Sequence, residues 1–90
     1  MTEDTGIRDE VDNILTERRS QHGDFTCHAR ITQDLKRVMA AEYTTSHTAI
    51  QREALEMIQH KIGRILAGNP NHQDHWHDIT GYAKLVADRI

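Results

Sequence analysis

Basic and aromatic side chains between Lys61 and Tyr82 have types and spacing that could hold a phosphate group. Lys61 and Arg64 stand three residues apart before a turn, and Asp78 and Tyr82 stand four apart after it. An arginine fork donates two parallel hydrogen bonds to a phosphate, and a nearby carboxylate can orient the fork. We therefore predict Lys61, Arg64 and Tyr82 as phosphate-binding residues, together with Arg30 from an earlier segment.

The same segment also permits a purely structural interpretation. A short turn between two helices makes them antiparallel neighbours. If the turn is centred on Asn71, then Arg64 and Asp78 are equidistant from it and face each other. An ion pair between Arg64 and Asp78 would fix the register of the two helices.

Two glycines fit a close crossing of these helices. Glycine inside a helix costs about 1 kcal/mol relative to alanine, so its presence suggests that a neighbour must come close. We expect Gly81, and Gly63 on the facing helix, to make room where the two helices cross.

A set of carboxylates is the candidate for a metal site. Glu53 and Glu56 stand at i and i+3, on one side of a helix, and Asp78 is the acidic residue of the facing helix that is best placed to join them. Carboxylate oxygens are suitable ligands for Mg²⁺. The alternative is that these carboxylates form a solvated helix face.

Polar residues also gather around Gly23, where the first helix breaks. The structural interpretation is a capped loop, and the functional one is a wall of an anion pocket, because helix N-termini favour negative ligands. The histidines at positions 72–77 match no strong zinc spacing, and Cys27 has no legible catalytic partner, so the role of both stays open. The residues near the break are Arg18, Arg19, His22, Asp24, His28 and Arg30.

Four helices must position these side chains. Apolar residues recur at helical spacing in four segments, with no alternating strand pattern between them. The sequence predicts an all-α fold: an up-and-down bundle of about four helices with a C-terminal antiparallel helical hairpin. Residues 1–5 are expected to be a disordered lead and 6–90 a single helical domain. The predicted helices span about 6–20, 26–43, 47–67 and 74–90.

The bulk composition excludes some classes of function. The net charge is −3 with neutral histidines, which makes a dedicated nucleic-acid binder an unfavoured interpretation. No apolar stretch approaches the ~20 residues of a membrane span, and no secretory signal is legible, so we expect a cytoplasmic protein without a membrane partner. The small size and the apolar terminal residue Ile90 favour a homo-oligomer.

Several motifs together resemble a known family. The pattern resembles small helical proteins of uncharacterised function that are encoded by tailed bacteriophages and prophages. It covers most of the chain after about Ile14. The motifs are Gln21-His22-Gly23-Asp24, His28-x-Arg30-Ile31, Lys61-Ile62-x-Arg64 and Asn69-Pro70-x-His72-x-Asp74-x-Trp76-x-Asp78-Ile79-x-Gly81-Tyr82.

That family in turn looks like a reduced relative of the MazG-like all-α nucleoside triphosphate pyrophosphohydrolases. Those enzymes hold Mg²⁺ with a Glu-x-x-Glu element on one helix and a Glu-x-x-Asp element on the next. The resemblance implies that Glu53 and Glu56 stand for the first element and Asp78 for the aspartate of the second, but His75 occupies the place of its glutamate. The incomplete set weakens the case for hydrolysis, which needs several carboxylates.

Three functions therefore remain from the sequence. The favoured hypothesis is a phage or prophage interaction protein that acts on a host or phage partner in the host cytoplasm. One alternative is a Mg²⁺-dependent pyrophosphohydrolase of dNTPs or NTPs. The other is a non-catalytic nucleotide or phosphate binder that uses Lys61, Arg64 and Asp78.

Overall fold

The computed structural model describes the backbone of residues 2–90 and the side chains of residues 7–90. This part of the chain holds four helices and no strand, which confirms the predicted all-α fold. The disordered lead expected at 1–5 falls on residues outside the described side chains and stays a prediction. The helices are α1 (Thr2–His22), α2 (Phe25–Glu42), α3 (Ala49–Ala67) and α4 (Gln73–Ala87).

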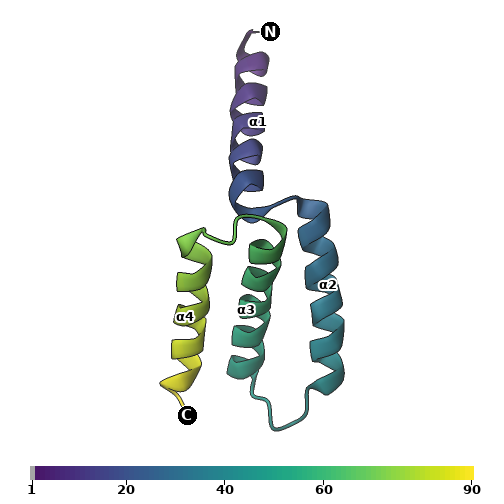
Figure 1. Ribbon diagram of the computed structural model, residues 1–90, viewed down its shortest axis with the longest axis vertical. Coiled ribbons are helices and arrows are strands. Elements are labelled where there is room, and N and C mark those ends of the chain that lie inside the picture. The colour runs from purple at the N-terminus through teal and green to yellow at the C-terminus, as the bar shows by residue number, and fades with distance from the viewer. Residues whose placement is uncertain (1) are drawn as a thin grey trace.

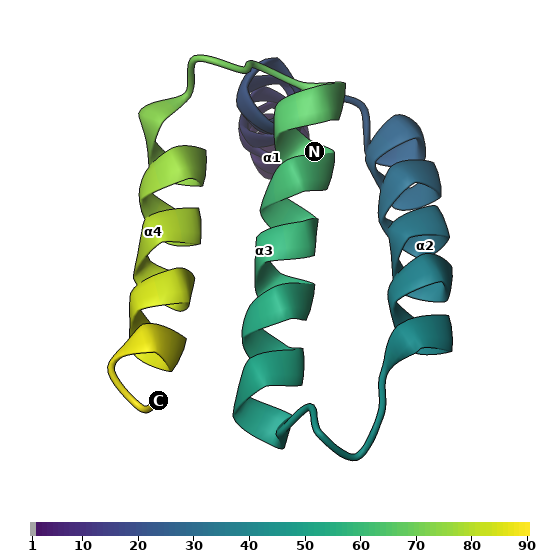
Figure 2. The same ribbon diagram turned by 60° about the horizontal axis from the view of Figure 1, so that its bottom comes forward.

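The last three helices form a single layer with α3 in the middle. Helices α2 and α4 pack on opposite sides of α3, and within the described residues they do not pack on each other (Figures 1 and 2). Helix α1 extends away from one end of this layer, which gives the molecule dimensions of 57 × 26 × 24 Å. The predicted antiparallel hairpin is formed by α3 and α4.

Local signals explain where α3 and α4 begin and end. The Thr48 hydroxyl accepts from the Gln51 backbone N–H, and the Gln51 side chain accepts from the Thr48 N–H, a capping box that starts α3. Gly68 ends α3, and Pro70 cannot continue it. Helix α4 begins at Gln73 after an N-cap at His72, earlier than the sequence predicts, and it ends at Ala87 rather than at the chain terminus.

Neither of the two glycines expected at the crossing of α3 and α4 makes room there. A Cβ on Gly63 would lie 2.6 Å from Thr32 Cγ2, so Gly63 makes room for α2 rather than for α4. Nothing lies within 4 Å of the corresponding position at Gly81, and the prediction that Gly81 permits a close crossing is wrong. The absence of a side chain at Gly63 therefore allows α2 to pack closely against α3.

The interior of the layer is polar. Among the described side chains, Ala54 is the only apolar residue that is buried. The other buried side chains are His28, Thr32, Gln59, Lys61 and His75. No helix in the described part of the chain combines the length and apolar character that a membrane crossing requires.

Candidate functional site

The two connections at one end of the layer are locked together backbone to backbone. The N–H of Asn69 donates to the carbonyl of Gln21 at 3.2 Å, and the Asn69 amide donates to the Gln21 side chain at 3.2 Å. Gly23 has φ +86°, and a Cβ there would lie 2.1 Å from the carbonyl oxygen of Ala67. Gly68 is equally close to this segment, since its Cβ would lie 2.4 Å from the Gly23 nitrogen. We call this contact between residues 21–23 and 67–69 the backbone clamp.

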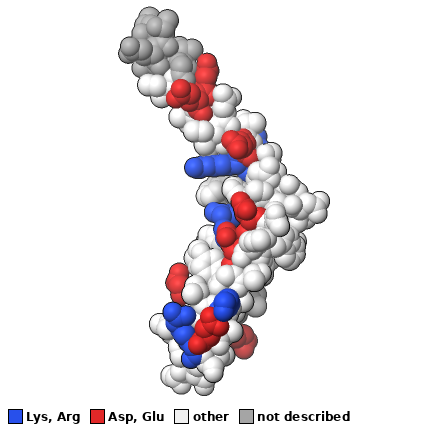
Figure 3. Space-filling view, turned by 90° about the vertical axis from the view of Figure 1, so that its left-hand side faces the viewer, with Lys and Arg blue, Asp and Glu red and all other residues white. Residues whose placement is uncertain are grey.

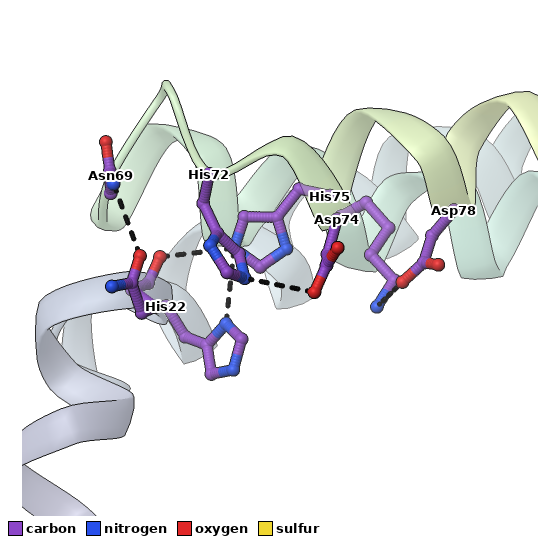
Figure 4. A network of polar contacts seen from close by, with 8 residues as sticks. His22, Asn69, His72, Asp74, His75 and Asp78 are labelled. Carbon is purple, nitrogen blue, oxygen red and sulfur yellow. Dashed lines mark hydrogen bonds and ion pairs between the residues drawn. The ribbon is translucent and has the colours of Figure 1, made fainter.

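A buried histidine completes the clamp from α4. His75 is 1% exposed, and its Nε2 lies 3.1 Å from the Gln21 carbonyl and 3.2 Å from His22 Nδ1 (Figure 4). The carbonyl can only accept, so Nε2 of His75 carries the hydrogen and His22 Nδ1 accepts. The neutral His22 ring must then hold its own hydrogen on Nε2. Burial lowers the pKa of both rings, which agrees with this neutral arrangement.

The turn before α4 is closed by two further hydrogen bonds. The indole N–H of Trp76 donates to the Pro70 carbonyl at 2.8 Å, and the N–H of His72 donates to the Asn69 carbonyl. The motif residues Gln21, Gly23, Asn69 and Trp76 thus build the clamp and the turn. Their observed role is architectural, because each one holds α1 or α4 against the end of α3.

A basic pocket of about 440 Å³ opens in the bend beside the clamp, between α1, α2 and α3. Three arginines and three histidines line it together with one carboxylate. Figure 3 shows the bend between α1 and the rest of the molecule, with Lys and Arg side chains around it. We call this cavity the elbow pocket, and it is lined by Leu15, Arg18, Arg19, His22, Gly23, Asp24, Phe25, His28, His60 and Arg64.

The surroundings of the three imidazoles in the elbow pocket favour their neutral form. Burial is the main cause that lowers the pKa of His22, His28 and His60. The positive charge of Arg64 lowers the pKa of His22 and His28 further, and at His60 the charge of Lys36 does so more strongly than that of Arg64. A pocket in which like charges suppress protonation favours an anion, since an anion would relieve that repulsion.

Arg64 enters this pocket instead of the predicted ion pair. The carboxylate of Asp78 lies 2.8 Å from Lys61 Nζ, and this hydrogen bond lowers the pKa of Asp78. The prediction of an ion pair between Arg64 and Asp78 is therefore wrong. The partner of Asp78 is Lys61, about one helical turn before Arg64 on α3. Among the described residues, Arg64 has no carboxylate within 4.0 Å, so its guanidinium is available to a ligand.

The other predicted phosphate-binding residues lie away from the elbow pocket. Lys61 is buried and engaged by Asp78, and Tyr82 is half-buried on α4 outside the pocket lining. Arg30 is exposed on α2, where its guanidinium lies 3.9 Å from the sulfur of Cys27. The structure thus brings Arg64 together with Arg18, Arg19 and His28 from the first connection, rather than with Lys61 and Tyr82.

The predicted metal ligands do not converge. Glu53 and Glu56 are on α3 and Asp78 is engaged by Lys61, and no group of three His, Cys, Asp or Glu side chains within the described residues is arranged to hold a metal ion. The histidines of the 72–77 segment divide between roles. His75 is buried in the clamp, His72 lies 3.7 Å from Asp74, and His77 is exposed.

A family match covers nearly all of this architecture. Residues 7–90 match the model of a domain of unknown function, DUF6378. The chain belongs to this family. No curated protein and no solved structure matches it significantly. The DUF6378 match therefore spans α1 from Ile7 onward, the clamp, the elbow pocket and the hairpin, without assigning an activity to any of them.

Sequence reasoning missed the parts of the site that depend on tertiary contact. Gln21 and His75 carry no periodic signal, and no local pattern marks His60 as a residue of the pocket. The signal that was present is the pair Gly23 and Gly68, each at the end of a helix. Two glycines in separate connections are compatible with a backbone-to-backbone contact, which only the fold reveals.

Proposed function

We propose that this DUF6378 protein binds a phosphate-bearing small molecule in the elbow pocket without hydrolysing it. The observation that carries the proposal is the convergence of Arg18, Arg19 and Arg64 on one pocket of about 440 Å³. Cavities of about 300–1,000 Å³ accommodate small-molecule ligands of this size class. Arg64 was also a phosphate-binding candidate from the sequence, but its partners in this proposal are Arg18 and Arg19 instead of Lys61 and Tyr82.

Charge and geometry both support an anionic ligand. Asp24 is the only carboxylate residue among those that line the elbow pocket, against three guanidinium groups. Guanidinium forks bind phosphate in a bidentate manner and are weakly hydrated, so a partly enclosed site favours arginine over lysine. The neutral imidazoles of His22, His28 and His60 can each donate one hydrogen bond to a phosphate oxygen.

Hydrolysis has less support than binding. Removal of pyrophosphate by a MazG-like reaction requires carboxylates that hold Mg²⁺ and activate water. Glu53, Glu56 and Asp78 are not gathered at the elbow pocket, and Asp78 is already paired with Lys61. The proposed ligand, a nucleotide or another phosphate ester, would therefore be bound through its phosphates alone.

The test is a binding measurement with inorganic pyrophosphate and nucleoside triphosphates as probes, in the presence of EDTA. We expect a rise in the melting temperature and a calorimetric binding signal that weakens with salt, since charge pairing dominates. Arg64→Gln should abolish both. Arg30→Gln is the matched control, because Arg30 lies outside the pocket lining. Equal binding by the Arg64→Gln variant and the unaltered chain would contradict the proposal.

An interaction protein is the second candidate function. The specific observation in its favour is the number of large apolar side chains that lie exposed, among them Phe25 at 79%. A phage or prophage origin, a host or phage partner and action in the host cytoplasm belong to this hypothesis, which rests on the sequence resemblance. It predicts that a partner protein, rather than a phosphate ester, raises the melting temperature.

A further inference from the structure

Helices α3 and α4 present an open apolar face. Leu55, Ile62 and Leu66 follow each other at i, i+7 and i+11, so they project from one side of α3. Their exposed fractions are 42%, 38% and 66%. A groove of about 570 Å³ continues from Leu55 and Ile58 to α4, where it is lined by Ala83, Val86, Ala87 and Ile90. We call these residues of α3 and α4 the apolar face.

The layer lacks the apolar core that would hold it together alone. A helix buries its apolar stripe against a second layer in known domain architectures. Here only Ala54 is buried among the apolar side chains of residues 7–90. Helices α2 and α4 cover the sides of α3 but leave the apolar face without a covering layer.

The excess of exposed surface has the size of a protein–protein interface. The chain exposes 6855 Å², whereas a compact monomer of 10.4 kDa exposes about 5,400 Å². Each copy therefore exposes about 1,450 Å² more than a compact monomer, to which the projecting α1 and the apolar face both contribute. An obligate homodimer buries about 2,000 Å² or more in total, so about 1,000 Å² from each copy, a part of this excess, would suffice.

We propose that a second copy of this chain covers the apolar face and forms a two-layer dimer of helices. The stripe and its groove contain no Lys, Arg, Asp or Glu side chain. Obligate homodimer interfaces have this apolar character, whereas transient interfaces carry more polar groups. The fold itself needs the cover, and the partner present whenever this chain is made is another copy of it.

Packing in the dimer follows from the shape of the face. A twofold axis presents the same patch from both copies, so Ile62 and Leu66 of one α3 pack against the same stripe of the other. Ile90, which is 88% exposed, would be covered at the far end of the groove. The elbow pocket and the groove have no lining residue in common, so each copy in the dimer keeps its own proposed ligand site.

The first experiment measures the molar mass of the full chain in solution by light scattering and sedimentation. We expect twice the chain mass of 10.4 kDa at micromolar concentration. Ile62→Glu should shift the population to monomer or unfold the chain, because it places a charge in the interface. Leu85→Glu is the control: Leu85 is 50% exposed on α4 but does not line the groove, so this variant should remain a dimer.

A second measurement keeps the test decisive if Ile62→Glu does not fold. In a Cys27→Ser background, a short bis-maleimide should join two copies that carry Ile62→Cys and leave copies with Leu85→Cys unlinked. A folded monomer at all concentrations would overturn the proposal. So would a dimer in which only Leu85→Cys cross-links, or a monomer whose apolar face is covered only after a different protein is added.

Discussion

Lys61 and Asp78 join α3 to α4 across 2.8 Å, with the Lys61 side chain 11% exposed and the Asp78 side chain 46% exposed. The pair therefore has one end in the layer and one end in water. In the sequence, Lys61 and Asp78 are equidistant from the bond between Asn69 and Pro70, so the turn is centred there. The pair sets the register of the hairpin, and the hydrogen bond from Lys61 lowers the pKa of Asp78.

Removal of Asp78 should destabilise the hairpin more than removal of the whole pair. Asp78→Ala leaves the buried ammonium of Lys61 without a partner, whereas Lys61→Met combined with Asp78→Ala removes both charges. We expect the single variant to unfold at lower urea concentration than the double variant. Chemical denaturation at fixed protein concentration checks this, and equal midpoints of the two variants would show that an unpaired Lys61 carries no cost.

Alanine should have opposite effects at Gly23, which is in the clamp, and at Gly81, which is outside it. Gly23→Ala places a Cβ against the Ala67 carbonyl at φ +86°, and we expect a loss of at least about 1–3 kcal/mol in the free energy of unfolding. Gly81→Ala meets nothing within 4 Å inside α4, and we expect a gain of about 0.5–1 kcal/mol. Urea denaturation of both variants measures the difference. A neutral Gly23→Ala variant would contradict the clamp.

The capping box of α3 predicts a smaller loss. Thr48→Ala removes the side-chain acceptor of the Gln51 N–H, which should lower the free energy of unfolding by about 1 kcal/mol. Thr48→Ser keeps an oxygen in the same place and should retain most of the stability. Thermal unfolding followed by circular dichroism separates the two variants, and identical losses would show that the cap hydrogen bond has no energetic role.

The helices could be predicted from the sequence because their signals are local. The apolar stripe of α3 and the stop at Gly68 and Pro70 depend on residues a few positions apart. The partner of Asp78 could not be predicted, because the register depends on where the turn is centred. Trp76 binds the Pro70 carbonyl and α4 starts at Gln73, so the turn is earlier than a centre at Asn71 requires.

The elbow pocket could be predicted only in part for the same reason. Arg18, Arg19, His22 and His28 belong to one connection, and their gathering follows from the sequence. The contribution of Arg64 from α3 follows from tertiary packing, because the clamp brings the end of α3 beside the first connection. No local pattern contains that contact.

Stability should fall as the pH drops below about 6.5. The pKa of His22, His28, His60 and His75 is lowered in the folded chain, mainly by burial. As the pH falls, the unfolded chain therefore binds protons first, near the ordinary histidine pKa of about 6.5. This proton binding stabilises the unfolded state and lowers the free energy of unfolding. Urea denaturation at pH 7.5 and 5.5 checks this. Asp78 acts in a lower window, since its lowered pKa supports stability until the pH falls through that value.

Ligand binding should show the opposite pH dependence. An anion in the elbow pocket offsets the positive field of Arg64 and raises the pKa of His28 and His60, so binding takes up protons. We therefore expect sulfate, whose charge is the same at both values, to bind more tightly at pH 5.5 than at pH 7.5, as long as the chain is folded at both. Calorimetry in buffers of different ionisation enthalpy measures the uptake directly. His60→Gln should reduce the uptake and keep the guanidinium contacts, whereas His77→Gln, an exposed control outside the pocket, should leave it unchanged. Proton-independent binding in the unaltered chain would show that the anion does not reach the imidazoles.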